Sequence, residues 1–192
     1  MLPAIVPKAR IAVYNYDSKW HRNAPQTRLQ LCAEDLVQNL HIFRDGVRDR
    51  PIILIGHSLG GLVIQNALLR AKSLQDGKYL YLLQATKGFV ALGAPFRGTK
   101  MQPLASFCAS CMSLVGADGG VIRDLVYDND TLRDLLHEFC QIRDRYLIPA
   151  CCFFELYETD YGKRFGLPGL FRGRVVPESS ACVDGWDRVI LP

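Results

Sequence analysis

A short apolar run that passes through a glycine turn into a second apolar run constrains this chain most strongly. Residues 51–64 read PIILIGHSLGGLVI. The four branched aliphatic residues from Ile52 to Ile55 are typical of a parallel strand covered on both faces, where hydrophobic alternation disappears. From Leu59 onward the residues are apolar almost all round, which predicts a buried helix. The sequence therefore predicts a strand, a tight turn and a helix in direct succession.

Ser58 occupies the apex of this turn, within Gly56-His57-Ser58-Leu59-Gly60. Flanking glycines let strand and helix approach without a Cβ clash and hold the serine in a strained conformation with its hydroxyl exposed. The helix start directs N–H groups and a positive dipole end at the serine, so the Leu59 N–H could stabilise an oxyanion. The pattern favours a nucleophile elbow over the alternative, an ordinary turn in which Ser58 caps the helix.

Composition limits the classes of protein to which the chain can belong. With 192 residues, of which 49% are hydrophobic and 22% charged, residues 1–192 are expected to form one globular domain. The net charge of +4 is scattered, without the basic stripe and interleaved aromatics that a nucleic acid would need. The first ten residues do not read as a signal peptide, and no apolar run approaches membrane-spanning length.

The cysteines and glycines give no sign of a metal or cofactor. An odd set of seven cysteines without a secretory signal indicates reduced thiols in an intracellular compartment. Cys108 and Cys111 have metal or redox spacing, but no second pair with histidines follows, so one helix face is the favoured interpretation. No G-x-x-x-x-G-K-[ST] phosphate loop occurs, and Gly116-Ala-Asp-Gly-Gly120 is expected to be a plain loop.

Strand and helix patterns alternate along the chain, which predicts an α/β fold with a parallel sheet. Its ligand site should lie at the carboxyl ends of the strands, where Ser58, Pro95 and Glu155 all fall. Besides the elbow, the expected strands are Ala9–Asp17, Lys87–Pro95, Cys151–Glu155 and Gly173–Pro177, and the expected helix spans Arg28–Arg44, closed by Gly46. Residues from about 101 to 147 are expected to form a helical cap, including a helix capped at Asn129-Asp-Thr131.

Four motifs occur in order and at plausible separations: Gly56-His-Ser-Leu-Gly-Gly61, Ala91-Leu-Gly-Ala-Pro-Phe-Arg-Gly98, Phe153-Phe-Glu155 and Val175-Val-Pro-Glu-Ser-Ser-Ala181. Together they resemble the intracellular α/β-hydrolase domain of the serine active site-containing protein group. The version in fungal proteins that precedes NACHT or repeat modules is especially similar, and GPI inositol-deacylases and lipases are more distantly similar. The resemblance spans about Ala9 to Ala181 and implies a partial α/β-hydrolase fold.

The resemblance also implies roles for single residues. Ser58 matches the nucleophile, Leu59 the backbone oxyanion donor, and Glu155 the acid that orients a catalytic histidine. A carboxylate that leaves an apolar strand needs a partner if it is buried, which supports Glu155 independently. Glu158 and Asp160 remain alternatives, as does a Glu155 that faces solvent. His57 fills the elbow and is expected to have no chemical role.

The chain departs from the family pattern at three places. The four histidines, His21, His41, His57 and His137, all precede Glu155, whereas the triad histidine of this fold follows the acid. We do not expect His137 to replace the catalytic histidine, because it lies in the cap region and precedes the acid. The family also has an earlier strand, which ends in a His-Gly-type loop that completes the oxyanion hole and lies in the sheet between the Ala9–Asp17 strand and the elbow strand. This sequence is expected to lack that strand. Phe96 stands where the family often has histidine.

These departures predict a fragment or decayed copy of a larger hydrolase, with a gap or re-pairing in the sheet and, as a hypothesis, marginal stability. The favoured function is a serine ester hydrolase acting on a lipid or other carboxylic ester, slowed by the missing histidine. The alternative is a non-catalytic interaction or regulatory module of a larger signalling protein. The chain is expected to be intracellular. The resemblance implies either a cytoplasmic protein or one in peripheral contact with membranes of the endoplasmic reticulum or mitochondrion.

Overall fold

The computed structural model of the 192-residue chain describes residues 2–15, 25–74, 77–97, 129–155, 159–160, 172–173 and 178–191. The helices are α1 (Leu2–Ile5), α2 (Pro25–Phe43), α3 (Leu59–Ser73), α4 (Leu80–Ala85), α7 (Asn129–Tyr146) and α8 (Glu178–Ala181). The strands are β1 (Ile52–His57), β2 (Thr86–Leu92), β3 (Ala150–Glu155), β4 (Thr159–Asp160), β5 (Arg172–Gly173) and β6 (Asp187–Leu191). Strands and helices alternate through most of the described chain, as the sequence predicts.

A four-stranded parallel sheet with the order β1-β2-β3-β6 forms the centre of the molecule. Successive strands are neighbours, so each connection returns the chain to the same end of the sheet before the next strand begins. The carboxyl ends of the four strands therefore lie along one edge. β4 and β5 form a separate two-stranded antiparallel sheet.

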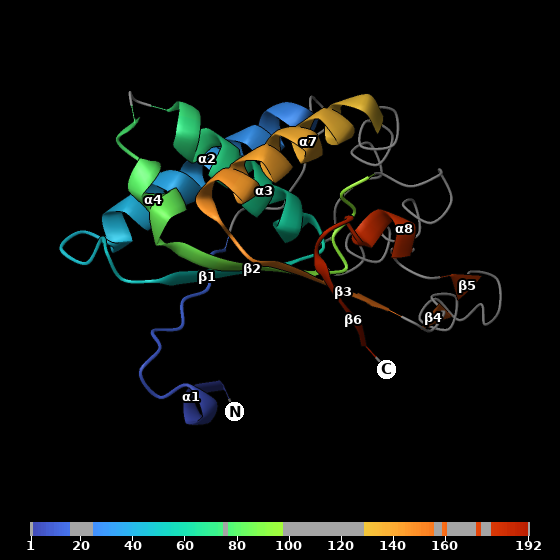
Figure 1. The fold of residues 1–192 in the computed structure, drawn as a ribbon, viewed down its shortest axis with the longest axis horizontal. Coiled ribbons are helices and arrows are strands. Elements are labelled where there is room, and N and C mark those ends of the chain that lie inside the picture. The colour runs from blue at the N-terminus through green and yellow to red at the C-terminus, as the bar shows by residue number, and fades with distance from the viewer. Residues whose placement is uncertain are drawn as a thin grey trace.

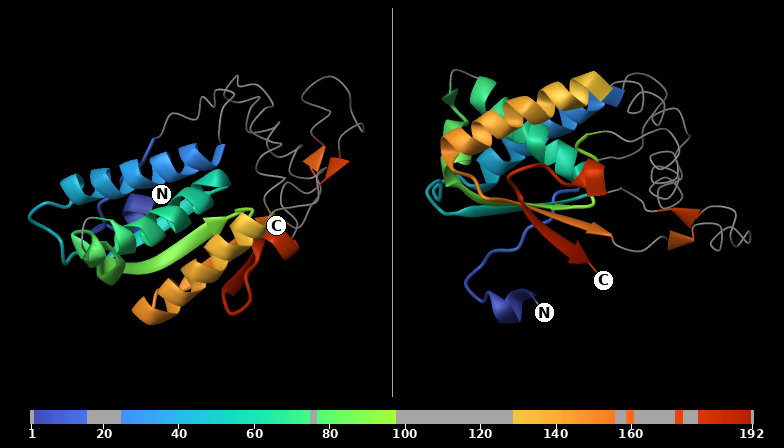
Figure 2. Two further views of the ribbon diagram at one scale, coloured as in Figure 1. Left: turned by 90° about the horizontal axis from the view of Figure 1, so that it is seen from above. Right: turned by 45° about the vertical axis from the view of Figure 1, so that its right-hand side comes forward.

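The longer helices cover one face of this sheet (Figure 1 and Figure 2). α3 packs between α2 and α7, and the core lies where these helices meet the sheet. Several elements give fully buried side chains to this core, for example Leu62 of α3, Phe89 of β2 and Phe139 of α7. Burial of apolar side chains between the helices and one face of the sheet therefore stabilises the described part of the fold.

The opposite face of the sheet is open at β1, which corrects the expectation of a strand covered on both faces. Ile53 and Ile55 are 65% and 57% exposed, whereas Leu54 between them packs against the core. Among the described elements, only the short α1 and the segment after it lie on that side (Figure 1). Although residues 52–55 are all aliphatic, only one face of β1 is buried.

The strand expected over Ala9–Asp17 is wrong for the residues that the structure describes. Ala9–Asn15 is irregular, and β1 ends the sheet on that side as far as the chain is described. The Tyr14 hydroxyl donates to the backbone carbonyl of Cys32 at 3.1 Å and to a carboxylate oxygen of Asp35 at 2.6 Å. These bonds attach the segment to α2, away from the sheet edge.

The last strand of the main sheet also differs from the expectation. Gly173 belongs to β5, which pairs with β4, and residues 174–177 lie outside the described residues. The fourth strand of the sheet is β6, which pairs in parallel with β3. Its sequence, Asp-Arg-Val-Ile-Leu, has an apolar run of only three residues, which is too short to identify it as a strand, and Val189 and Ile190 are 38% and 55% exposed.

The predictions for the remaining long elements are confirmed, apart from α4, which the sequence analysis missed. α2 and β3 fall within three residues of the expected bounds, and α7 is confirmed, although residues 129–131, expected to cap it, form its first turn. α7 overlaps the region assigned to the cap, but it packs on α3 and buries Phe139 and Ile142 in the core. Residues 101–128, with Cys108, Cys111 and Gly116–Gly120, lie outside the described residues, so a cap there stays a prediction. Within the described chain, no helix combines the length and apolar character needed to cross a membrane.

Candidate active site

The turn between β1 and α3 has the strained geometry that the sequence predicts, but the expected exposure of the serine is wrong, because Ser58 is buried and only 5% exposed. Ser58 has φ 58° and ψ −128°, a region that few residues other than glycine occupy. Its backbone N–H donates to the carbonyl of Leu92 at 2.9 Å, and its carbonyl accepts from the N–H of Gly61 at 3.0 Å. The serine is therefore held from the neighbouring strand and from the helix at once.

Two glycines make this tight turn possible. A Cβ on Gly56 would lie 2.7 Å from the Gly61 nitrogen, and one on Gly61 would lie 2.5 Å from the Ala94 Cβ. Neither distance is compatible with a real side chain. Gly60, in contrast, faces open space, with nothing within 4 Å of such a carbon. The close approach thus depends on Gly56 and Gly61 rather than on the second glycine of the five-residue motif.

The alternative role of Ser58 as a helix cap finds no support. Ser58 stands at the N-cap position of α3, but its side chain makes no capping hydrogen bond. Leu59 is the first residue of this 15-residue helix, so its N–H lies among the helix-start donors at the positive end of the dipole. The turn therefore places a serine beside a partial positive charge without using its hydroxyl as a cap.

Glu155 ends β3 at the same edge of the sheet. Leu92 pairs with Phe153, and the Gly93 N–H donates to the Phe153 carbonyl at 2.8 Å. Because β2 separates β1 from β3, Ser58 and Glu155 leave the sheet two strand spacings apart, roughly 10 Å. A histidine ring could lie between side chains at that separation.

The acid itself stays a prediction. The side chain of Glu155 and the whole of Glu158 lie outside the described residues. Asp160 belongs to β4, where it pairs with Arg172 in the smaller sheet. The backbone therefore supports a strand-end position for Glu155 without choosing among the three carboxylates.

The histidines do not gather at this edge in the described chain. His57 is exposed and shares the side of β1 on which Ile53 and Ile55 lie, away from the helices. His137 is exposed on α7, where its Nε2 is 3.0 Å from the Gln141 side-chain nitrogen. His41 lies near the end of α2, and His21 is outside the described residues. The described residues thus leave the base of a triad unassigned.

A cluster of four aromatic side chains, Phe89, Phe96, Phe139 and Trp186, lies behind the turn and was not foreseen from the sequence. Neighbouring rings have centroids 5.2 to 6.1 Å apart in edge-on arrangements. Phe96 is fully buried, and its ring tip would be 3.7 Å from a Cβ on Gly61. Phenylalanine at this position therefore packs the helix start from behind. Phe96 lies three residues after Gly93, the first residue of the loop that follows β2, and its aromatic character was the only signal in the sequence.

An ion-pair chain holds the loop that follows this cluster. The Arg97 guanidinium is 2.8 Å from one Asp184 oxygen, and Arg188 is 3.0 Å from the other. The hydrogen bond from Arg97 is the main cause that holds the pKa of Asp184 below its usual range. These exposed pairs connect the loop after β2 with the turn before β6.

Curated proteins are similar to this chain over most of its length. Protein SERAC1 of Danio rerio is 30% identical over 188 residues, which cover 94% of this chain and 26% of that protein. Protein SERAC1 of Homo sapiens is 27% identical over 180 residues, or 91% of this chain and 25% of that protein. The chain spans about a quarter of the length of these relatives. The relation to SERAC1, serine active site-containing protein 1, is thus distant but extends over most of the chain.

The fold resembles that of a bacterial lipase. The mature form of Bacillus licheniformis lipase BlEst2 aligns with a TM-score of 0.56 and 16% identity, over 84% of this chain and 64% of that one. The propeptide form gives a TM-score of 0.54, over 35% of its chain. A family model described as the alpha/beta hydrolase family matches residues 6–186. The chain therefore belongs to the alpha/beta hydrolase family.

Proposed function

We propose that Ser58 is the nucleophile of a serine ester hydrolase. The observation that carries this proposal is the backbone of Ser58, held at φ 58° between β1 and the start of α3. Strain of this kind persists only where the surroundings enforce it, and it is common at reactive residues. Membership of the alpha/beta hydrolase family supports the same assignment.

In the proposed reaction, the Ser58 Oγ attacks the acyl carbonyl carbon of an ester while a base takes its proton. The carbonyl oxygen becomes an oxyanion, which the Leu59 N–H and the positive end of α3 would stabilise. The base then returns the proton to the departing alcohol, and water hydrolyses the acyl-enzyme. Glu155 is proposed to orient the base, a histidine that the described residues do not supply.

The substrate is proposed to be a lipid or another carboxylic ester. The likeness to a lipase concerns the fold alone, and SERAC1 proteins are about four times longer than this chain. We also propose that the protein makes peripheral contact with a membrane, where a lipid substrate would lie.

A fluorophosphonate label combined with hydrolysis of p-nitrophenyl butyrate tests this function. We expect Ser58 to be labelled, and Ser58→Ala to abolish both labelling and the turnover that the chain has. Ser73→Ala, at the far end of the same helix, is the matched control and should leave labelling unchanged. A folded chain that reacts at no serine would contradict the proposal and would favour the non-catalytic module.

A further inference from the structure

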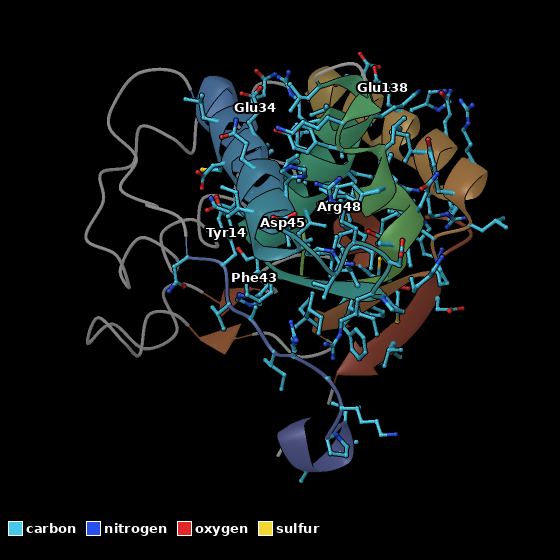
Figure 3. All side chains as sticks on the ribbon, turned by 90° about the vertical axis from the view of Figure 1, so that its left-hand side faces the viewer. Tyr14, Glu34, Phe43, Asp45, Arg48 and Glu138 are labelled. Atoms are coloured by element: carbon cyan, nitrogen blue, oxygen red, sulfur yellow. The ribbon has the colours of Figure 1, made fainter. Side chains whose placement is uncertain are left out.

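Positive side chains gather at the end of the sheet opposite Ser58. The loop 44–50 leads from α2 into the amino end of β1, whereas Ser58 follows its carboxyl end. Figure 3 faces this end of the molecule and shows Asp45 and Arg48 close together on it. Arg44 comes from the same loop, and Lys78 comes from the segment before α4.

Arg44 supplies a fixed charge beneath this surface. The residue is 6% exposed, and its Nη2 donates to the backbone carbonyls of Arg48, at 2.9 Å, and of Arg50. Its Nε is buried without a hydrogen-bond partner, and no carboxylate of the described residues forms an ion pair with it. Burial lowers the pKa of Arg44, because a charged guanidinium is costly in a low dielectric, and the nearby Tyr81 and Asp49 only partly oppose this effect.

His41 lies between two tyrosines beside this charge. Its Nδ1 is 3.2 Å from the Tyr81 hydroxyl, and its ring stands edge-on to Tyr79 with centroids 5.1 Å apart. The Arg48 guanidinium lies over the Tyr81 ring at 5.4 Å, and the Lys78 ammonium lies over the Tyr79 ring at 5.1 Å. The two cations therefore flank one imidazole, each held over an aromatic face.

The cations of this cluster, Arg44, Arg48 and Lys78, outnumber the two described carboxylates beside it, Asp45 and Asp49. Arg48 is 3.7 Å from Asp45, whose side chain is 84% exposed, so this pair is weak and open to exchange. Desolvation, then Lys78 and Arg48, lower the pKa of His41, and Asp45 opposes them. An added anion would therefore meet a positive field that the described residues leave only partly neutralised.

We propose that Arg48, Lys78, His41 and Tyr81, above the buried Arg44, form a binding site for a phosphate group. A phosphate offers several acceptor oxygens in a tetrahedral arrangement, which suits donors that come from different elements around one imidazole. The Arg48 guanidinium can donate two parallel hydrogen bonds, and the Lys78 ammonium acts as a point charge. The His41 Nδ1 and the Tyr81 hydroxyl are hydrogen-bonded to each other, so this pair offers one further donor while His41 is neutral and two when it is protonated. Arg44 contributes its charge without touching the ligand. This site does not depend on the reaction proposed for Ser58.

Titration of the full chain with inorganic phosphate, followed by the NMR signals of the His41 ring, tests the site. We expect saturable shifts and a rise in the His41 pKa, because a bound anion offsets Lys78 and Arg48. The variant Arg48→Gln with Lys78→Gln should weaken binding about tenfold, since two charge-assisted contacts are lost. The control, Arg145→Gln with Lys87→Gln, makes the same change in charge on α7 and β2 and should bind as the unaltered chain does.

Equal shifts with chloride at matched ionic strength would overturn the site, since simple screening would then explain them. Unaltered binding by the Arg48/Lys78 variant would overturn it as well. If that variant does not fold, Lys78→Gln alone is compared with Lys87→Gln, because both residues are exposed. Vesicles of phosphatidylcholine with and without phosphatidic acid identify the source: binding to the acidic vesicles assigns a lipid headgroup, and binding to phosphate alone assigns a soluble ligand.

Discussion

A side-chain carbon on Gly56 would lie 2.7 Å from the backbone nitrogen of Gly61, so strand and helix meet backbone to backbone at this point. The contact brings α3 down onto the carboxyl end of β1. It leaves Ser58 to complete the reversal within a single residue, which explains the positive φ of that serine. The strain at Ser58 and the absence of a side chain at Gly56 are thus one structural feature.

Adding one methyl group should test this contact directly. Gly56→Ala and Gly61→Ala should each lower the free energy of unfolding by about 3 kcal/mol, because the new carbon meets atoms that cannot turn aside. Gly60→Ala is the matched control. Its carbon enters open space within a helix, so it should be neutral or stabilise by about 0.5–1 kcal/mol. Urea unfolding of the three variants measures the difference, and equal effects at Gly60 and Gly61 would contradict this account.

The strain at Ser58 predicts an unusual order of stability between two variants. Ser58→Gly should unfold with a free energy about 1 kcal/mol higher than Ser58→Ala, because glycine adopts φ 58° without a steric cost. At Ser73, in the last turn of α3, alanine should instead be the more stable of the two. Thermal unfolding of the four variants checks both orders. If the alanine variant is the more stable one at both positions, backbone strain at Ser58 does not contribute measurably to the free energy of unfolding.

The aromatic cluster behind the turn should contribute strongly to stability. Phe96→Ala removes a ring with no exposed surface and should cost about 3–5 kcal/mol, a large share of the stability of a domain. Phe43→Ala is the control, since Phe43 is 59% exposed at the end of α2 and should change stability by about 0.5 kcal/mol or less. The denaturant concentrations at the midpoints of unfolding of the two variants, compared with that of the unaltered chain, measure the two losses of stability. Similar midpoints would show that Phe96 does not support the elbow.

The local features of the turn could be predicted because short-range chemistry determines them. Glycines around a serine, between an apolar strand and an apolar helix, allow few backbone conformations, and Ser58 adopts the expected one. The parallel order of β1, β2 and β3 follows from alternating strands and helices for a similar reason. The position of Glu155 at a strand end required only the apolar run before it.

Features that depend on distant contacts were missed. The run from Ile52 to Ile55 does not reveal that one face of β1 is open, because the covering elements lie elsewhere in the chain. The alternation of Ala9–Asp17 resembles a strand, but the hydroxyl of Tyr14 binds to α2. Phe96 is explained by the rings that it contacts from β2 and from the turn before β6. Sequence patterns report local preference, and these outcomes depend on tertiary packing.

A thiol in the middle of the sheet predicts how stability changes at high pH. Burial raises the pKa of Cys152 to about 12, although the residue would titrate near its ordinary value of 9.0 in the unfolded chain. The thiol's contribution to stability is therefore fully present below pH 9 and is lost as the pH rises towards 12. Cys140, Cys151, Cys182 and Tyr81 also have raised pKa values, so the unaltered chain combines several such losses.

Comparison with Cys152→Ala isolates the share of this thiol. Between pH 9 and 12 the free energy of unfolding should fall more steeply with pH in the unaltered chain than in the variant. The slopes should differ by up to about 1.4 kcal/mol per pH unit, the value for one titrating proton. Urea unfolding at a series of pH values measures both slopes. Iodoacetamide at pH 9 gives a second readout: Cys152 should stay unmodified in the folded chain and react once urea is added. Parallel slopes together with rapid alkylation of the folded protein would show that the Cys152 thiol is not shielded as its burial implies.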